Sequence, residues 1–389
     1  MAHDILERIA KADLCTGCGL CAAIAGDRRV MMWMSESGYL HPSVAGELTA
    51  SEDAAIRATC PGLGVTQIAE QGASVDPRWG PIRYMGSGYA TDADWRHHAS
   101  SGGALSAVLR HLMETGQVDG VIQVAGDSTR PVDNVTVINR ASEGILAAAG
   151  SRYAPSAPLA GLHEVLRQQA RFAFVGKPCD VAALRAYAEI RPEIDERIPY
   201  KLSFFCAGIP SRRGSERILE KLGVSEHRLR AFKFRGDGWP GFATATTVEG
   251  ETSRMSYHDS WGGILSNHLQ PRCKICADGV GSLADIVCAD AWHCDEDGYP
   301  LFDEEHGRSA IVARTETGQA ILSAAIDAGY LETEPLDPET LVAMQPFQSR
   351  RKGLSLMRML ALRLFGRRVP RYRNLNLKHV SRKWAPVSG

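Results

Sequence analysis

The chain has 389 residues, 44% hydrophobic and 23% charged, with ten cysteines and a formal net charge of −1 at pH 7. This length allows about two domains with sizeable cores, the near-neutral charge argues against a nucleic-acid binder, and cysteines this sparse exclude a secreted disulfide scaffold. No stretch reaches the roughly 18 uninterrupted apolar residues of a membrane span and no signal-peptide core is evident, so we expect a cytoplasmic protein with reduced thiols.

Residues 1–70 are predicted to form an iron–sulfur head. Cys15, Cys18 and Cys21 follow C-x2-C-x2-C spacing, and the distant Cys60 is followed directly by proline. This is three-quarters of a bacterial ferredoxin ligand run with its Cys-Pro partner displaced by an insertion. Zinc sites usually pair two C-x2-C units, and a disulfide set is the other alternative. The spacing favours these four cysteines as ligands of a 4Fe–4S cluster, and therefore electron transfer.

A glycine-rich turn follows the head. Residues 71–88 are rich in Gly and Pro and are expected to be a connector. The run Ser100-Ser101-Gly102-Gly103 precedes residues 105–113, where apolar side chains recur at helical spacing up to the stop at Gly116. A helix start of this kind can hold a phosphate, although an ordinary N-cap explains the same residues.

Short apolar runs and helical patterns then alternate. Strands are expected at 172–175 and 202–205, with helices at 181–187, where Asp180 is the expected cap, and at 211–222. This alternation predicts a parallel sheet, so the fold class is α/β, with a mixed α+β sheet core behind a ferredoxin-like head. Further expected elements are strands at 121–124, 135–138, 284–288 and 310–313, a hairpin at 229–248 and a helix at 316–328. The expected domains are 1–70, 71–160, 161–345 and a basic tail, 346–389.

A second group of cysteines is predicted to bind metal. Cys179 and Cys206 each follow an expected strand, and parallel neighbours would place both at the carboxyl edge of the sheet, where such sheets bind ligands. With Cys273 and Cys276 they supply four thiolates, enough for a second 4Fe–4S cluster. A local alternative, holding zinc or iron, groups Cys273 and Cys276 with two other cysteines. These are Cys288 and Cys294, the first in an apolar run and the second in an acidic loop.

Three loops combine a basic or aromatic residue with glycine or proline. They span residues 150–156, 176–179 and 234–241. Such loops can clamp an anionic, planar cofactor through charge and stacking, but they can also be simple turns with solvated Arg and Lys. No G-x-G-x-x-G fingerprint follows a strand, so a conventional NAD site has little support.

The motifs, taken in order, resemble those of the coenzyme F420 hydrogenase/dehydrogenase β-subunit family, which is related to 7-hydroxymethyl chlorophyll a reductase and a ferredoxin-dependent 8-vinyl reductase. The matching pieces lie at 15–21, 60–61, 100–103, 118–122, 150–153, 175–179, 205–208, 273–276 and 284–290. The resemblance implies FAD and 4Fe–4S clusters, with Cys179, Cys206, Cys273 and Cys276 as ligands nearest the flavin. It also implies a flavin neighbourhood made of Ser101, Gly102, Gly103, Ser151, Arg152, Tyr153 and Lys177. Cys288 departs from the family pattern and keeps the local alternative open.

Two functions follow from this resemblance. In the first, a ferredoxin-type donor passes single electrons through two clusters to FAD, which reduces a small-molecule acceptor by two electrons. In the second, the chain is a non-catalytic electron-transfer β subunit of a larger hydrogenase or dehydrogenase complex, with coenzyme F420 as a candidate partner. The sequence identifies no proton donor.

The C-terminal segment is strongly basic. Residues 350–383 contain twelve Lys or Arg and no Asp or Glu, which leaves 32 basic against 45 acidic residues elsewhere. An acidic electron carrier such as ferredoxin could dock there. The apolar residues among these arginines allow a peripheral membrane contact instead, and a helix packed on the body is a third interpretation.

Overall fold

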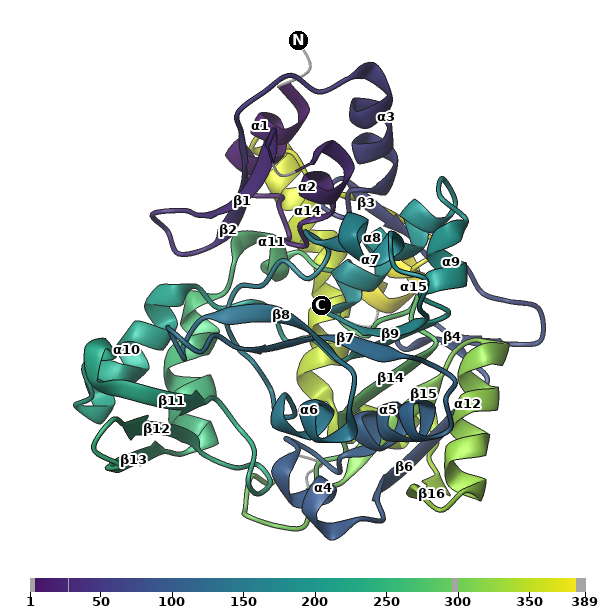
Figure 1. The fold of residues 1–389 in the computed structure, drawn as a ribbon. Helices are drawn as coiled ribbons and strands as arrows, with labels where there is room; N and C mark the ends of the chain where they lie inside the picture. Colours follow the sequence, from purple (N-terminus) through teal and green to yellow (C-terminus); the bar gives the residue numbers. More distant parts are fainter. Residues whose placement is uncertain (1–3, 27, 296–299, 383–389) are drawn as a thin grey trace, which may run out of the picture.

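A computed structural model describes residues 4–26, 28–295 and 300–382. Its centre is an eight-stranded mixed sheet in which β7, β9, β10 and β14 are parallel, while β15, β6, β16 and β8 pair antiparallel to their neighbours (Figure 1). In spatial order the strands are β16 (Leu331–Pro335), β6 (Tyr84–Ala90), β15 (Ser309–Ala313), β14 (Ile286–Asp290), β10 (Tyr200–Phe204), β9 (Phe172–Val175), β7 (Gly120–Gly126) and β8 (Asn134–Asn139).

Helices cover both faces of this sheet and enclose two apolar cores. One core lies against α4 (Ala93–His98), α5 (Ala104–Glu114) and α12 (Glu316–Asp327). The other lies against α7 (Leu162–Leu166), α8 (Pro178–Ala188), α9 (Glu193–Arg197) and α13 (Pro338–Met344). The short helix α6 (Ser142–Ala147) packs beside α5 and β8. Because the central strands are buried on both sides, their sequences are nearly continuous apolar runs.

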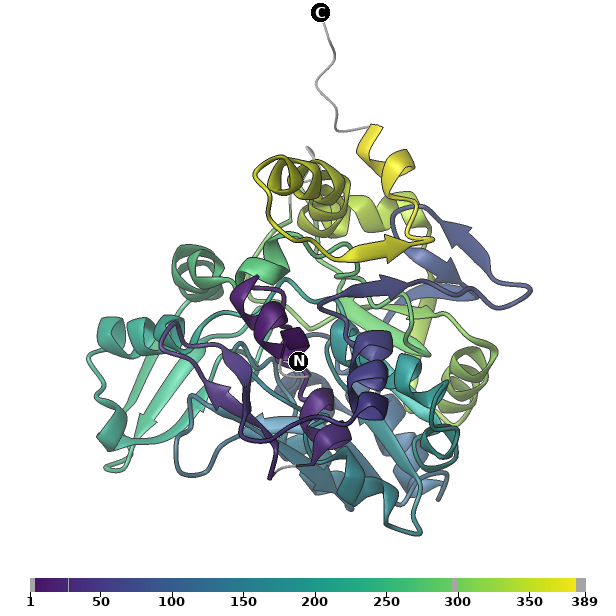
Figure 2. The ribbon, with the colours of Figure 1, turned by 90° about the horizontal axis from the view of Figure 1, so that it is seen from above.

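The head forms a separate small core that packs against α7 and α8. It contains α1 (Asp4–Lys11), α2 (Leu20–Ala25), the antiparallel hairpin of β1 (Val30–Met34) and β2 (Leu40–Val44), and α3 (Ala50–Thr59). A capping box between Thr49 and Glu52 fixes the start of α3. Figures 1 and 2 show the head beside the long helix α14 (Pro346–Leu364), whose Met359 belongs to the head core.

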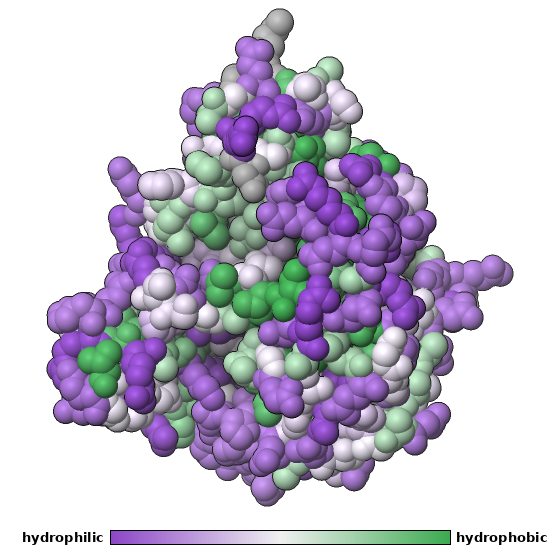
Figure 3. All heavy atoms as spheres, in the orientation of Figure 1, coloured by the Kyte–Doolittle hydropathy of each residue, from purple (hydrophilic) through white to green (hydrophobic). Residues whose placement is uncertain are grey.

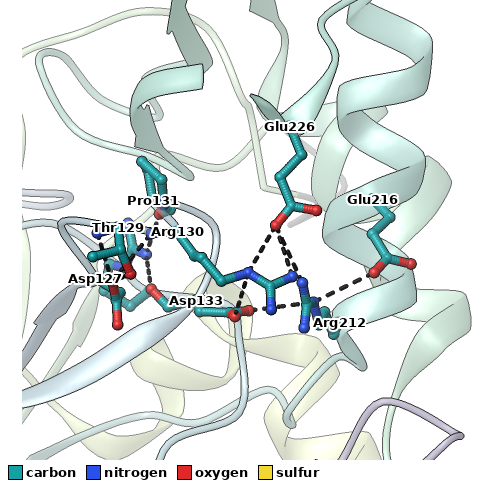
Figure 4. A network of polar contacts seen from close by, with 9 residues as sticks. Asp127, Thr129, Arg130, Pro131, Asp133, Arg212, Glu216 and Glu226 are labelled. Carbon is teal, nitrogen blue, oxygen red and sulfur yellow. Dashed lines mark hydrogen bonds and ion pairs between the residues drawn. The ribbon is translucent and has the colours of Figure 1, made fainter. Parts of the chain in front are cut away.

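A smaller antiparallel sheet lies to one side of the molecule. It is formed by β11 (Leu229–Lys233), β12 (Ala243–Thr247) and β13 (Thr252–Met255), and packs with α10 (Arg212–Leu222) and the short helices at Glu226–Arg228, His258–Ile264 and Leu265–His268. A polar network fastens this unit to the β7–β8 loop (Figure 4). In that network the Glu226 carboxylate accepts hydrogen bonds from Arg130 at 2.7 Å and from Arg212 at 3.1 Å.

The strand–helix alternation predicted between 172 and 222 is confirmed: β9 and β10 are parallel neighbours joined by α8 and α9. The predicted cap differs in position: Lys177 is the N-cap residue of α8, and Asp180 lies in the first turn, where its carboxylate accepts a 2.9 Å hydrogen bond from the Lys177 amide. The hairpin of β11 and β12 is also confirmed. On the face drawn in Figure 3, apolar atoms gather over the edge strand β8, where Val135 and Ile138 are exposed.

The expected connector at 71–88 is not a connector throughout. It contains the short hairpin of β4 (Ser74–Asp76) and β5 (Gly80–Ile82), and then β6, which lies inside the large sheet between β15 and β16. Gly86 and Gly88 made β6 look like a loop in the sequence. A Cβ at Gly88 would lie 2.1 Å from the Glu332 carbonyl oxygen, so glycine lets β16 approach β6 closely.

The basic C-terminal segment is a packed part of the fold through residue 382. After α14 it forms β17 (Arg371–Arg373), which pairs in parallel with β3 (Gly64–Thr66), and α15 (Leu377–Arg382). This is the third interpretation of the sequence, a helix packed on the body. Lys383 lies outside the described residues, and membrane contact stays a prediction. Among the described helices, none is both long and apolar enough to cross a bilayer.

Candidate functional site

Four cysteines of the head face one cavity; we call Cys15, Cys18, Cys21 and Cys60 the head cysteines. Cys15 and Cys18 lie in the loop after α1, Cys21 in the first turn of α2, and Cys60 directly after α3. The loop needs glycine at Gly19, where φ is +85° and a Cβ would lie 2.8 Å from the Ala160 amide nitrogen. Most of the remaining lining is apolar, with Thr16 and Thr59 as its polar side chains; the apolar residues include Leu6, Ile9, Leu20, Ile24, Met32 and Ile56.

The head cysteines are close enough to affect one another's ionisation. Burial raises the pKa of the Cys18 thiol to about 12, and the neighbouring Cys60 adds to the increase. Burial and the other head cysteines also raise the pKa values of Cys15 and Cys21. Four thiolates in this apolar pocket therefore require a compensating positive charge, which a metal core supplies when it deprotonates its ligands.

Four further cysteines converge at the carboxyl end of β9 and β10; we call Cys179, Cys206, Cys273 and Cys276 the body cysteines. Cys179 lies in the first turn of α8, Cys206 follows β10, and Cys273 lies in α11 (Pro271–Lys274). Burial raises the pKa of Cys273 to about 12, with Cys206 and Cys276 contributing. Burial likewise raises the pKa of Cys179, and Cys206 and Cys273 contribute there. The Ile209 amide donates to the Cys273 sulfur at 3.4 Å.

The local grouping with Cys288 and Cys294 is not what the structure brings together. Cys288 is a buried strand residue of β14 in the apolar core beside α5, and burial alone raises its pKa to about 12. Cys294 lies among Asp295 and Arg308, and no other thiol affects its raised pKa. Within the described residues, no three Cys, His, Asp or Glu side chains form a group that could hold a single metal ion. In a 4Fe–4S cluster the four thiolates bind different irons, so they are spread around the core rather than converging on one atom.

The two cysteine groups are joined through α11. The Gln270 side-chain amide donates a buried hydrogen bond of 2.6 Å to the Cys15 carbonyl oxygen. Two residues later, the Arg272 guanidinium donates 2.8 Å to the carbonyl oxygen of Pro61, which follows Cys60. Arg351 of α14 donates to the Cys206 carbonyl oxygen. Helix α14 therefore contacts a body cysteine directly.

The glycine-rich turn at 100–103 lies at the same sheet edge but is tightly packed. The Gly102 amide donates 2.9 Å to the Ser309 hydroxyl, and the Ser101 hydroxyl donates 2.9 Å to the Arg308 carbonyl oxygen. Gly103 has a left-handed φ of +73° and precedes α5. These contacts tie the turn to the start of β15, so its backbone has a structural role.

Arg152 and Tyr153, two further predicted flavin neighbours, also have protein partners. The Arg152 guanidinium donates to four acceptors, namely Asn134 Oδ1 and the carbonyl oxygens of Phe232, Pro131 and Asp133. Burial lowers the pKa of Arg152 to about 10. The Tyr153 ring lies 4.6 Å from the Trp261 ring. Ser151 is half-buried in the same loop.

Lys177 lies beside the body cysteines. Its Nζ forms a 2.7 Å ion pair with Asp180 and donates 2.8 Å to the Ser156 hydroxyl. Burial opposes the lysine's charge, but Asp180 and then the thiol of Cys179 raise its pKa. A buried positive charge is therefore held next to the body cysteines.

Sequence reasoning missed an aromatic cluster at the end of β14. The Asp290 carboxylate accepts hydrogen bonds from Arg235 at 2.7 and 2.8 Å and from the Trp239 indole at 2.7 Å. The Trp239 and Trp292 rings stack 4.7 Å apart, and the Arg235 guanidinium lies 4.8 Å from the centre of the Tyr257 ring. Residues 284–290 and the 234–241 loop are separate motifs in the sequence, and only the fold brings them to one edge.

Comparison with known proteins decides the family. Two models match, described as the N-terminal and C-terminal parts of the coenzyme F420 hydrogenase/dehydrogenase β subunit, over residues 85–163 and 169–339. The chain belongs to the coenzyme F420 hydrogenase/dehydrogenase β-subunit family. The matched residues include all four body cysteines, whereas the head cysteines lie before them.

Several similar proteins are named as hydrogenase or formate dehydrogenase β subunits. The coenzyme F420 hydrogenase subunit beta of Methanosarcina barkeri is 26% identical over 294 residues, which cover 74% of this chain and 89% of the relative. That of Methanococcus voltae is 28% identical, covering 64% of this chain and 84% of the relative. The F420-dependent formate dehydrogenase 1 subunit beta of Methanococcus maripaludis is 23% identical, covering 65% and 62%.

A solved structure shares the family fold. One chain of the F420-reducing [NiFe] hydrogenase complex from Methanosarcina barkeri superposes with a TM-score of 0.59 and 24% sequence identity, covering 77% of this chain and 98% of that chain. This confirms the expected mixed α/β architecture. Membership of the F420 hydrogenase/dehydrogenase β-subunit family also confirms the resemblance drawn from the motifs.

Proposed function

We propose that this chain is an electron-transfer β subunit of a larger oxidoreductase complex, and that it carries two 4Fe–4S clusters and FAD and exchanges electrons with coenzyme F420. The observation that carries the proposal is the separation of eight cysteines into two buried groups joined through α11. The relatives, which are named as hydrogenase and formate dehydrogenase β subunits, support a subunit over an independent ferredoxin-dependent reductase.

The residues present fit the clusters. The head cysteines and the body cysteines would each hold one cluster, and apolar side chains such as Ile9 and Ile56 would keep water from the first. A 4Fe–4S cluster carries single electrons, and a flavin carries two and exchanges hydride. Gln270 and α11 hold the two groups at a fixed separation, which electron transfer between them requires.

The carboxyl edge of the sheet is the proposed seat of FAD. Lys177 and the Arg235–Asp290 pair supply fixed charge there, and Trp292 and Tyr257 supply aromatic surface. The donor atoms of Arg152 are occupied by protein acceptors, so in our proposal Arg152 shapes the loop at 150–153 rather than binding a cofactor phosphate. Ferredoxin as donor stays a prediction of the sequence.

An anaerobic count of iron, sulfide, zinc and flavin on the purified chain tests the proposal. We expect about eight irons and one FAD per chain. Cys60→Ser and Cys276→Ser should each lose about four irons. Reduced with dithionite and then freed of it, the chain should transfer electrons to coenzyme F420.

Cys288→Ser and Cys294→Ser are the matched controls, because both replace cysteines outside the two groups. Both variants should keep the full iron content. Iron loss from these controls would show that the second cluster is held by the local grouping of Cys273, Cys276, Cys288 and Cys294. Zinc without iron and flavin would contradict the proposal altogether, and two clusters with no electron transfer to F420 would remove F420 as the acceptor.

A further inference from the structure

A buried arginine lies between the two cysteine groups. Arg272 is only 3% exposed and directly precedes the body cysteine Cys273 in α11. Its Nη2 donates 2.8 Å to the carbonyl oxygen of Pro61, the residue after the head cysteine Cys60. Arg272 is thus the chain neighbour of a body cysteine, and it is hydrogen-bonded to the backbone next to a head cysteine.

The charge of Arg272 has no carboxylate partner in the described part of the chain. Its Nη1 donates 2.7 Å to the Tyr372 hydroxyl, and its Nε is buried with no hydrogen-bond partner there. The buried Arg235, by contrast, forms a two-point ion pair with Asp290. A buried guanidinium without a counter-charge is costly, so its retention calls for anions nearby.

The thiolates that would hold the two clusters supply those anions. On the head side, the Pro61 carbonyl oxygen that accepts from Arg272 belongs to the residue directly after Cys60. On the body side, Cys273 directly follows Arg272 in α11. The buried cation therefore lies beside a head cysteine and a body cysteine.

We propose that Arg272 is a shared electrostatic bridge that raises the reduction potentials of both clusters and holds their ligand segments together. This inference rests on the proposed two-cluster function. A cluster with four thiolate ligands is an anion, and reduction adds one more negative charge. A fixed cation in a dry site stabilises the reduced form of each cluster, and the effect is large because the interior screens charge weakly.

The test compares Arg272→Gln, Arg272→Lys and the parent protein, each as anaerobic holoprotein, by redox titration followed with electron paramagnetic resonance. Arg272→Gln should lower the midpoint potentials of both clusters. Arg272→Lys, which keeps the charge, should keep both potentials close to the parent values. Arg358→Gln is the matched control, since Arg358 also donates to α11, at the Lys274 carbonyl oxygen, but is exposed; it should change neither potential.

Each result decides the matter. An Arg272→Gln protein with full iron and unchanged potentials, or with only one potential lowered, would overturn the shared role. If neither Arg272→Gln nor the more space-filling Arg272→Met assembles its clusters, the iron contents of the variants decide. Loss of both clusters in these two variants, with both clusters kept in Arg272→Lys, supports the bridge. Any other pattern of cluster loss overturns it. A parent protein with fewer than two clusters would instead contradict the proposed function itself.

Discussion

At the scale of single residues, the interior contains several charged groups besides the one between the cysteine groups. Lys352 of α14 is 4% exposed, and its Nζ donates 2.9 Å to the Arg78 carbonyl oxygen. Burial lowers its pKa to about 8; Arg314 lowers it further, while Asp278 and Asp76 act in the opposite direction. Burial dominates because the nearby cation and the two anions partly cancel one another.

This lowered pKa predicts a rise of stability with pH. In the unfolded chain Lys352 keeps its proton up to about pH 10.4, whereas in the folded protein it releases the proton near pH 8. Between these pH values the unfolded state binds more protons than the folded state. The free energy of unfolding therefore increases with pH through that window. Lys352→Met should therefore stabilise the protein by roughly 1–3 kcal/mol at pH 7 and remove that increase. Thermal unfolding midpoints from pH 7 to 10.5 measure it. The exposed Lys378→Met is the control, and parallel profiles for Lys352→Met and the parent would refute the prediction.

At the scale of elements, the sequence predicted those that carry their own pattern. The apolar run at β9 and the helical spacing of α5 and α8 need no distant partner to be recognised. The strand β6 was missed because its sequence is dictated by its neighbours. Gly86 and Gly88 are needed where β16 approaches, and no local rule signals that contact.

The turn at 100–103 also needs glycine because neighbouring backbone lies close to it. A Cβ at Gly102 would lie 2.7 Å from the Gly88 carbonyl oxygen and 2.8 Å from the Ser309 amide nitrogen, both of which are backbone atoms that cannot swing away. Gly102→Ala should thus destabilise the protein by about 2 kcal/mol. Gly263→Ala meets no atom within 4 Å and should cause no loss. Equal thermal unfolding midpoints for the two variants would contradict this prediction, because they would show that the backbone around Gly102 adjusts to a Cβ without loss of stability.

At the scale of the whole molecule, the cysteine groups could be predicted better than the segments that support them. Spacing identified the head cysteines, and the shared sheet edge suggested Cys179 with Cys206. Nothing in residues 346–382 indicated that Arg351 would contact Cys206 or that Tyr372 would contact Arg272. Charge dominated the interpretation of that segment, because its buried apolar residues, such as Met359, Leu375 and Val380, are few and widely spaced.

Removing the C-terminal segment should therefore damage the entire protein. Truncation after Gln345 removes the buried side chains of Met359, Leu375 and Val380, which are 5%, 2% and 2% exposed, and uncovers the apolar residues that they pack against. At about 2 kcal/mol for each side chain, the free energy of unfolding should fall by about 6 kcal/mol. It also removes β17 from β3. A solubility assay and thermal unfolding measure the loss. The joint change of Leu364→Ser and Phe365→Ser, at positions 88% and 83% exposed, should leave stability unchanged. A truncated chain that stays soluble, melts like the parent and retains both clusters would show that this segment is an appendage rather than a structural support for them.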